Sequence, residues 1–115
     1  MSWKVFYSAK AKQDLQNIYE YIAFELLVPE TAAGQIHRLI AMIRSLNQMP
    51  LRHPVYDEEP WKSKNIRTVA VDHYLVFYLP QEKDKTVTVV RIIYGGRDLT
   101  KQKKDSDDHL PVTTE

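Results

Sequence analysis

The chain has 115 residues, a formal net charge of +1 at neutral pH and no cysteine. A chain of this length suits one compact domain, and the missing cysteines exclude a disulfide framework, thiol catalysis and cysteine-based zinc sites. Charged residues interrupt the apolar residues of positions 1–30, and no apolar run approaches the roughly 18 residues of a membrane span. We therefore expect a cytoplasmic protein with no membrane partner.

The lysines and arginines gather in the second half of the chain. Residues 61–104 hold ten Lys and Arg against four Asp and Glu, whereas the last eleven residues, DSDDHLPVTTE, hold four acidic residues and no Lys or Arg. This distribution fits either a solvated surface with a disordered tail or a surface that faces a polyanion or an acidic partner. We place one domain at residues 1–99 and a charged, flexible tail at residues 100–115.

The start of the chain predicts a strand followed by a helix. The alternation in SWKVFY places Trp3, Val5 and Tyr7 on one face of a short strand, and Ser8 suits a helix N-cap. From residue 9 to residue 27 the apolar period becomes helical. The resulting stripe consists of Ala11, Leu15, Ile18, Ile22 and Leu26.

A second helix is predicted from Pro29 to about Gln48. Proline suits the first position of a helix, and Met49-Pro50 ends this one because the residue before a proline is pushed out of the α region. The apolar stripe of this helix consists of Ala32, Ile36, Leu39, Ile43 and Leu46. The short connection between the helices predicts an antiparallel helical hairpin, whose two stripes need a common cover.

Three strands follow a polar loop that contains several prolines. We predict them at residues 65–71, 74–79 and 86–94, joined by a tight turn at Asp72-His73 and a charged turn at residues 80–85. The element order β-α-α-β-β-β indicates an α+β fold. In this fold the N-terminal helical hairpin packs on one face of a small antiparallel sheet.

Neither a metal nor a cofactor is expected. The histidines, at positions 37, 53, 73 and 109, show no H-x-x-x-H or H-E-x-x-H spacing. The only glycines, at positions 34, 95 and 96, form no phosphate-binding loop, and the chain has no G-x-S-x-G nucleophile motif.

Basic residues on the predicted strands are the remaining chemical feature. Arg91 interrupts the apolar strand at residues 86–94, and a buried unpaired charge is costly. It therefore either forms a salt bridge, for example with Asp72 or Asp98, or faces an anion such as a phosphate or a carboxylate. Gly95-Gly96 fits both alternatives, because glycine permits a positive φ at the strand exit. Further candidates for anion binding or stacking are Lys62, Lys64, Arg67, Arg97, Tyr74, Tyr78 and Tyr94.

Three stretches, taken in order, resemble the RelE/ParE superfamily of bacterial toxins: VFYSAKAKQDLQNIYEYIA, NIRTVAVDHYLVFYL and VTVVRIIYGGRD. The resemblance covers about residues 3–99 and includes Asp14 in the first helix, Arg67 and Tyr74 in the first two strands of the meander, and Arg91 in the last strand. It implies the toxin of a type II toxin–antitoxin module. The chain departs from the family pattern at Tyr94, where a histidine usually stands.

The resemblance implies one of two activities. A ParE-like toxin inhibits DNA gyrase by protein–protein contact, and the long, complete hairpin favours this branch. A RelE-like toxin cleaves messenger RNA on the ribosome without a metal, and the catalytic candidates are then Lys64, Arg67, Arg91, Tyr94 and Arg97. The candidates for contact with the target or with an antitoxin are Lys62, Lys64, Arg67, Tyr74, Arg91 and Arg97.

The resemblance also implies a cognate antitoxin, bound in a heteromeric complex that silences the toxin. We expect acidic residues of the antitoxin to cover part of the basic surface within residues 61–104. A further alternative is an inactive toxin homologue that acts only as an antitoxin-binding module. The acidic tail is a candidate autoinhibitory segment, with Asp105, Asp107 and Asp108 folding onto Lys101, Lys103 and Lys104.

Overall fold

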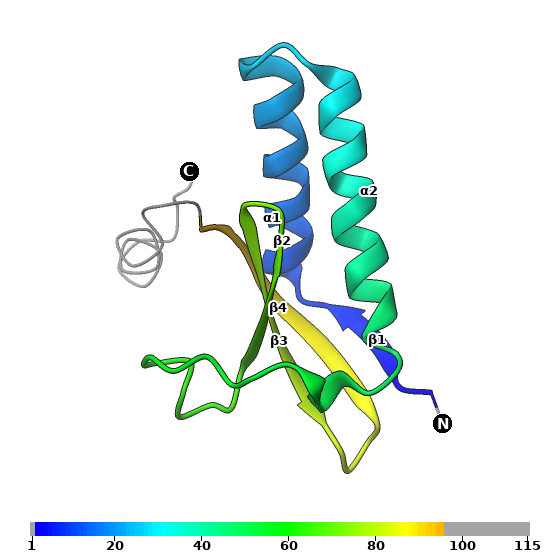
Figure 1. Ribbon diagram of the computed structural model, residues 1–115, viewed down its shortest axis with the longest axis vertical. Coiled ribbons are helices and arrows are strands. Elements are labelled where there is room, and N and C mark those ends of the chain that lie inside the picture. Colours follow the sequence, from blue (N-terminus) through cyan, green and yellow to red (C-terminus); the bar gives the residue numbers. More distant parts are fainter. Residues whose placement is uncertain (1, 96–115) are drawn as a thin grey trace.

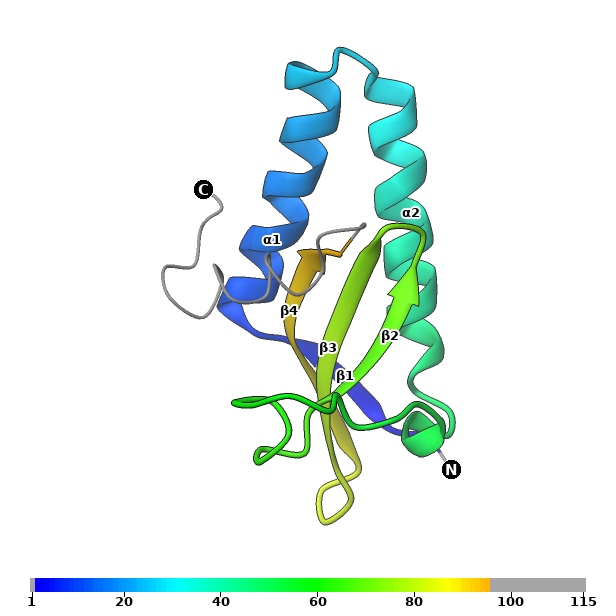
Figure 2. The same ribbon diagram turned by 60° about the vertical axis from the view of Figure 1, so that its left-hand side comes forward.

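The computed structural model describes residues 2–95 and places a helical hairpin against one face of a sheet (Figure 1). The hairpin extends well beyond the sheet at the end where α1 and α2 are connected, as both views show (Figure 2). In chain order, the elements are β1 (Lys4–Tyr7), α1 (Ala9–Glu20), a π-helical turn (Tyr21–Glu25), α2 (Pro29–Ser45), a 3₁₀ turn (Pro50–Arg52), β2 (Arg67–Val71), β3 (Tyr74–Gln81) and β4 (Thr86–Tyr94).

The sheet has the strand order β1-β4-β3-β2. Strands β2, β3 and β4 form the predicted antiparallel meander, and the turn at Asp72-His73 joins the first two of them. Strand β1 adds a parallel edge, with Lys4 opposite Thr86 and Tyr7 opposite Val89. The predicted α+β fold is confirmed, and the sheet is mixed because the first strand of the chain pairs with the last.

The main core lies between the hairpin and the sheet. The second helix contributes the buried residues Leu39 and Ile43, and Leu46 follows directly after its end. The sheet contributes Val76, Tyr78, Val87 and Val89 among others. Trp3 is buried and Val5 and Tyr7 pack on the same cluster, whereas Lys4 and Phe6 are exposed. The predicted alternation of β1 is therefore confirmed.

The opposite face of the sheet is covered by the segment that leads into β2. Trp61 stacks on Phe77, with 4.5 Å between ring centroids and 16° between ring planes, and Tyr56 meets Phe77 edge-on at 5.1 Å. Ile66 and Ile93 complete this second buried cluster. Both faces of the central strands are thus occupied, which the sequence did not predict.

The first helix ends earlier than predicted. Its stripe was expected to continue to Leu26, but α1 ends at Glu20 and a π-helical turn follows. The wider turn accommodates an extra residue and shifts the positions after it around the helix axis. Ile22 and Ala23 remain buried, whereas Leu26 is 53% exposed, so the prediction for Leu26 was wrong.

The other boundaries differ by a few residues. Helix α2 ends at Ser45, and the chain then tightens into i→i+3 hydrogen bonds up to Gln48. Strand β2 begins at Arg67 and β3 continues through Pro80 to Gln81. Among residues 2–95, no helix is both long enough and apolar enough to cross a membrane.

Candidate functional site

Strand β4 changes face at Arg91 because it contains a β-bulge. Phe77 of β3 pairs with Arg91 and Tyr78 pairs with Val89, so Val90 is the extra residue. A bulge of this kind re-aims the side chains that follow it. Before the bulge, Val87 and Val89 face the hairpin; after it, Ile92 does so. Strict alternation would have directed Arg91 into the apolar core instead.

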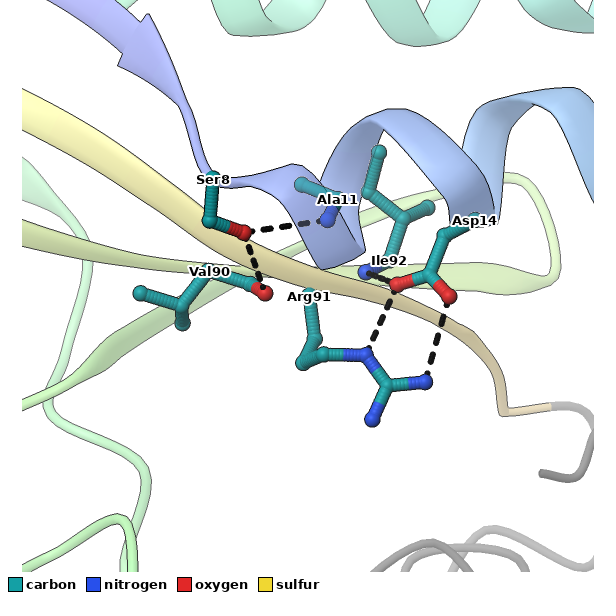
Figure 3. A network of polar contacts seen from close by, with 6 residues as sticks. All are labelled: Ser8, Ala11, Asp14, Val90, Arg91 and Ile92. Atoms are coloured by element: carbon teal, nitrogen blue, oxygen red, sulfur yellow. Dashed lines mark hydrogen bonds and ion pairs between the residues drawn. The ribbon is translucent and has the colours of Figure 1, made fainter. Parts of the chain in front are cut away.

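The beginning of α1 covers the edge of β4 beyond the end of β1. The Ser8 backbone N–H donates to the Val89 carbonyl at 2.9 Å, and the Ser8 hydroxyl donates to the Val90 carbonyl at 3.0 Å. The same hydroxyl accepts the Ala11 N–H at 3.0 Å, which makes Ser8 the predicted N-cap. Ser8 therefore caps the helix and satisfies the carbonyl of the bulged residue at once (Figure 3).

Asp14, six residues after Ser8 on α1, binds the other side of the bulge. Its carboxylate accepts the Arg91 guanidinium at 2.8 and 3.1 Å and the Ile92 backbone N–H at 2.8 Å. The two side chains are only 14% and 12% exposed, for Arg91 and Asp14 respectively. The predicted salt bridge of Arg91 is thus formed with Asp14, whereas Asp98 lies outside the described residues (Figure 3).

Asp72, the other partner suggested for Arg91, binds α2 instead. Its carboxylate accepts Arg38 Nε at 2.7 Å and the Gln35 amide at 3.0 Å. These hydrogen bonds, Arg38 first, lower the pKa of Asp72 below its usual value. The contact ties the β2–β3 turn to the hairpin, and Asp72 itself has the positive φ of 56° that a tight turn requires.

Arg67 has a structural role in the loop before β2. Its guanidinium donates to the His53 carbonyl at 2.6 Å and to the Leu51 carbonyl at 3.3 Å. Tyr78, opposite Arg67 in the ladder, donates its hydroxyl to the neighbouring Pro50 carbonyl at 2.7 Å. The two side chains therefore fix the path of residues 50–53 against the sheet.

The remaining predicted site residues do not form one cluster. Lys62 and Lys64 are exposed in the loop before β2, and Lys62 Nζ lies 3.3 Å from the Asp57 carboxylate. Tyr94 lies at the other end of the sheet, paired with Tyr74. Tyr74 is buried in the main core, whereas Tyr94 is 48% exposed and meets the Tyr74 ring edge-on at 5.5 Å. Arg97 lies outside the described residues.

Sequence reasoning missed a groove between α1 and α2. The groove has a volume of about 580 Å³ and is lined by Tyr7, Lys12, Leu15, Gln16, Tyr19, Ile36, Ile40 and Arg44. Its apolar floor comes from the outer margins of the two predicted stripes, and Lys12 and Arg44 supply positive charge. Burial raises the pKa of the Tyr7 phenol, while Arg44 acts in the opposite direction. The signal was present in the sequence as apolar residues beside each stripe, such as Ile40.

Within residues 2–95, no group of three or more His, Asp or Glu residues is placed to hold a metal ion. A family model matches residues 5–99 and is described as "ParE toxin of type II toxin-antitoxin system, parDE". The chain belongs to the ParE toxin family. The resemblance to the RelE/ParE superfamily is thus confirmed, and the ParE family is one of type II toxins.

Solved structures of related toxins share the fold of this ParE-family chain. The chromosomal ParDE system from P. aeruginosa matches with a TM-score of 0.64 and 20% identity, over 79% of this chain and 94% of the other. The RelBE2 toxin–antitoxin complex from Mycobacterium tuberculosis matches with a TM-score of 0.59 and 17% identity, over 82% and 92%. A free mutant of E. coli toxin RelE matches with a TM-score of 0.57 and 8% identity, over 96% and 99%. No protein with a curated description matches the chain.

Proposed function

We propose that this ParE-family chain is a toxin that inhibits DNA gyrase by protein–protein contact and is neutralised by a cognate antitoxin. The observation that carries the proposal is the structural use of Arg67 and Arg91. Arg67 holds two backbone carbonyls of the loop before β2, and Arg91 forms a largely buried pair with Asp14. Side chains that hold the fold together are poorly placed to act as catalytic groups on a large substrate.

The covered sheet face also favours contact over RNA cleavage. A nuclease needs a general base, a general acid and cations that converge on one phosphate. In the described part of the chain, Lys64 and Tyr94 lie at opposite ends of the sheet, and Trp61 and Tyr56 cover Phe77 between them. Contact with a protein target requires only a complementary surface, and the covered sheet face does not prevent such contact.

An antitoxin partner fits the groove between α1 and α2. The groove combines an apolar floor with Lys12 and Arg44, so it suits an amphipathic segment with acidic residues beside its apolar ones. The P. aeruginosa and M. tuberculosis relatives come from toxin–antitoxin systems, which supports a partner of this kind. Such a segment would order on binding, and its affinity would fall as salt is raised.

The test is a supercoiling assay with purified gyrase and the purified chain. We expect the chain to inhibit supercoiling of relaxed plasmid, and the product of the adjacent antitoxin gene to restore it. The same protein is added to a ribosome-dependent translation reaction, where the messenger RNA should remain intact. Codon-periodic cuts with normal supercoiling would replace the proposal by the ribonuclease alternative.

Growth in bacteria separates a toxin from an inactive homologue. Inducible expression of the chain without antitoxin should arrest growth and alter plasmid supercoiling in the same culture. Normal growth at a verified level of folded protein would favour the inactive homologue, and the gyrase proposal would be abandoned.

A further inference from the structure

The connected end of the helical hairpin exposes a group of large apolar side chains. Phe24 is 66% exposed and Leu27 is 76% exposed, and this end projects away from the sheet (Figure 2). The Tyr19 and Phe24 rings meet edge-on, with 6.3 Å between centroids. We call this group the hairpin tip; its members are Tyr19, Tyr21, Phe24, Leu26, Leu27 and Val28.

The backbone at the tip adopts two uncommon conformations. Tyr21–Glu25 forms a π-helical turn, and Leu27 lies in the left-handed region with φ 59°. A left-handed bulky residue is strained, and both features are found preferentially at functional sites. Their effect here is to direct apolar side chains outward, since Leu26 would have joined the buried stripe of a continuous α-helix.

A small buried cluster and two backbone hydrogen bonds hold the hairpin tip in place. Ile22, Ala23 and Ala32 form a small buried cluster of their own, with Ile18 packed against it. The Leu26 N–H donates to the Tyr21 carbonyl at 3.1 Å, and the Val28 N–H donates to the Ile22 carbonyl at 3.2 Å. An apolar surface on such a support binds without a large ordering cost.

The charges around the tip determine what it can bind. Between residues 19 and 36 the charged residues are Glu20, Glu25 and Glu30, and there is no Lys or Arg. An anionic membrane or a nucleic acid would be repelled by this rim. A second copy bound tip to tip would place the same acidic rims against each other. The remaining match is a protein surface with an apolar pocket and basic residues around it.

We propose that the hairpin tip is the surface through which this toxin contacts its target protein, and that the target offers an apolar pocket rimmed by Lys or Arg. This inference rests on the proposed function in requiring a protein target. It assigns that target to a surface that shares only Tyr19 with the groove between α1 and α2. Target and antitoxin therefore have separable contact residues on one hairpin.

The test compares a tip variant with a matched control. The tip variant is Phe24→Ser with Leu27→Asn, because asparagine tolerates the left-handed region. The control is Phe6→Ser, which removes another exposed phenylalanine, 51% exposed on β1. Each protein is assayed for growth arrest, for affinity to purified gyrase and for affinity to the antitoxin, which also reports folding.

We expect the tip variant to lose growth arrest and to bind gyrase about tenfold or more weakly, as is usual for the loss of central apolar anchors. Its affinity for the antitoxin should stay within about twofold, because its changes lie outside the groove. The control should behave as wild type in all three assays. Glu25→Lys should also weaken gyrase binding, and more strongly at low salt than at high salt.

The outcomes separate this inference from the proposed function. A tip variant that inhibits gyrase as well as wild type overturns the inference and leaves the gyrase proposal intact. Growth arrest without gyrase inhibition overturns the gyrase proposal, and the inference then stands only if the tip variant loses the arrest. A wild-type chain that causes no arrest overturns both. Tip-dependent pelleting with vesicles of phosphatidylcholine and phosphatidylglycerol, or tip-dependent dimers, would replace the protein pocket by a membrane or a second copy.

Discussion

The Asp14 carboxylate accepts hydrogen bonds from the side chain of one residue and from the backbone of the next. It binds the Arg91 guanidinium and the Ile92 N–H, on the part of β4 that β1 does not reach. A buried ion pair adds little net stability by itself, because both charges lose water. Removing one partner is far more costly, because the other charge stays behind without compensation.

We expect Asp14→Asn to lower the free energy of unfolding by about 3 kcal/mol, because it leaves the Arg91 charge in a largely buried site. The asparagine keeps the shape of the aspartate and one acceptor, so the loss reports mainly the charge. Urea denaturation of the purified variant measures the change.

The matched control for this prediction is Asp57→Asn. Asp57 also pairs with a cation, Lys62, but its side chain is 87% exposed. An exposed pair contributes about 0–1 kcal/mol, so this variant should unfold almost as wild type does. Equal losses of unfolding free energy in the two variants would mean that the buried Asp14 pair contributes no more to stability than the exposed Asp57 pair.

Tyr78 predicts a loss of stability at alkaline pH. Burial raises the pKa of its phenol to about 12, whereas an unfolded chain ionises tyrosine at about pH 10. The stabilising contribution is therefore complete below about pH 10 and is lost as the pH rises through about 12. Tyr78→Phe should cost about 1–2 kcal/mol at neutral pH, because the Pro50 carbonyl loses its donor.

The measurement is the urea midpoint of wild type and Tyr78→Phe between about pH 8 and pH 12. Wild type should lose stability more steeply than the variant across this range. Part of the slope should remain in the variant, because burial also raises the pKa values of Tyr7 and Tyr74. Parallel curves would mean that Tyr78 ionises alike in the folded and unfolded chains.

For Arg91, the sequence predicted that the charge needs a partner but not which residue the partner is. The need for a partner followed from placing a charge in an apolar strand. The identity of the partner did not, because Asp14 lies 77 residues away and the pairing depends on the bulge at Val90. Nothing in a period-2 pattern marks where a strand will bulge. Tyr74 was a contact candidate because the sequence does not show which face of the sheet this residue occupies. Its burial depends on the strand register.

At one position of the hairpin, the backbone conformation is unfavourable for a residue with a side chain. Leu27 adopts φ 59°, a conformation that costs an L-residue about 1 kcal/mol and costs glycine almost nothing. We therefore expect Leu27→Gly to raise the free energy of unfolding by about 0.5–1 kcal/mol. Thermal unfolding followed by circular dichroism measures the gain.

The adjacent residue gives the control for this prediction. Val28 is also exposed, but its φ of −130° lies outside the left-handed region, so glycine relieves no strain there. Val28→Gly should therefore lower the free energy of unfolding by about 0.5–1 kcal/mol through the greater freedom of the unfolded chain. Opposite signs at neighbouring positions would attribute the effect to backbone geometry and not to lost apolar surface.

Elements were predictable where one local signal dominated. Strand β4 was predicted with its observed bounds, because a run of β-branched residues ends at a glycine pair. The end of α1 was not, because the residues after Glu20 continue the apolar spacing while the backbone widens into a π-helical turn. The cover over Phe77 was missed because Tyr56 and Trp61 lie among prolines and follow no period.

Over the whole molecule, charge of opposite sign separates the two ends of the hairpin. Lys12 and Arg44 line the groove near the sheet, whereas acidic residues surround the tip. We expect Arg44→Glu to weaken antitoxin binding about tenfold or more, with the difference from wild type shrinking as salt is raised. Isothermal titration at two salt concentrations measures this change, and growth arrest without antitoxin should persist.

The control is Lys10→Glu, since Lys10 is exposed on α1 but does not line the groove. Its antitoxin affinity should be close to that of wild type. If Arg44→Glu binds normally while Lys62→Glu and Lys64→Glu bind weakly, the antitoxin covers the basic loop before β2 and not the groove.

The pairing of β1 with β4 also has a consequence for synthesis. The hairpin leaves the ribosome early, but the hydrogen bonds of Ser8 and Asp14 to β4 cannot form until residues 89–92 have been made. Contacts between such distant residues form late, after the intervening chain has been ordered. A nascent chain that stops before Thr86 lacks β4, the strand that joins β1 to β3, and therefore also lacks the hydrogen bonds that orient α1. The chain can therefore complete its fold only near the end of each round of translation.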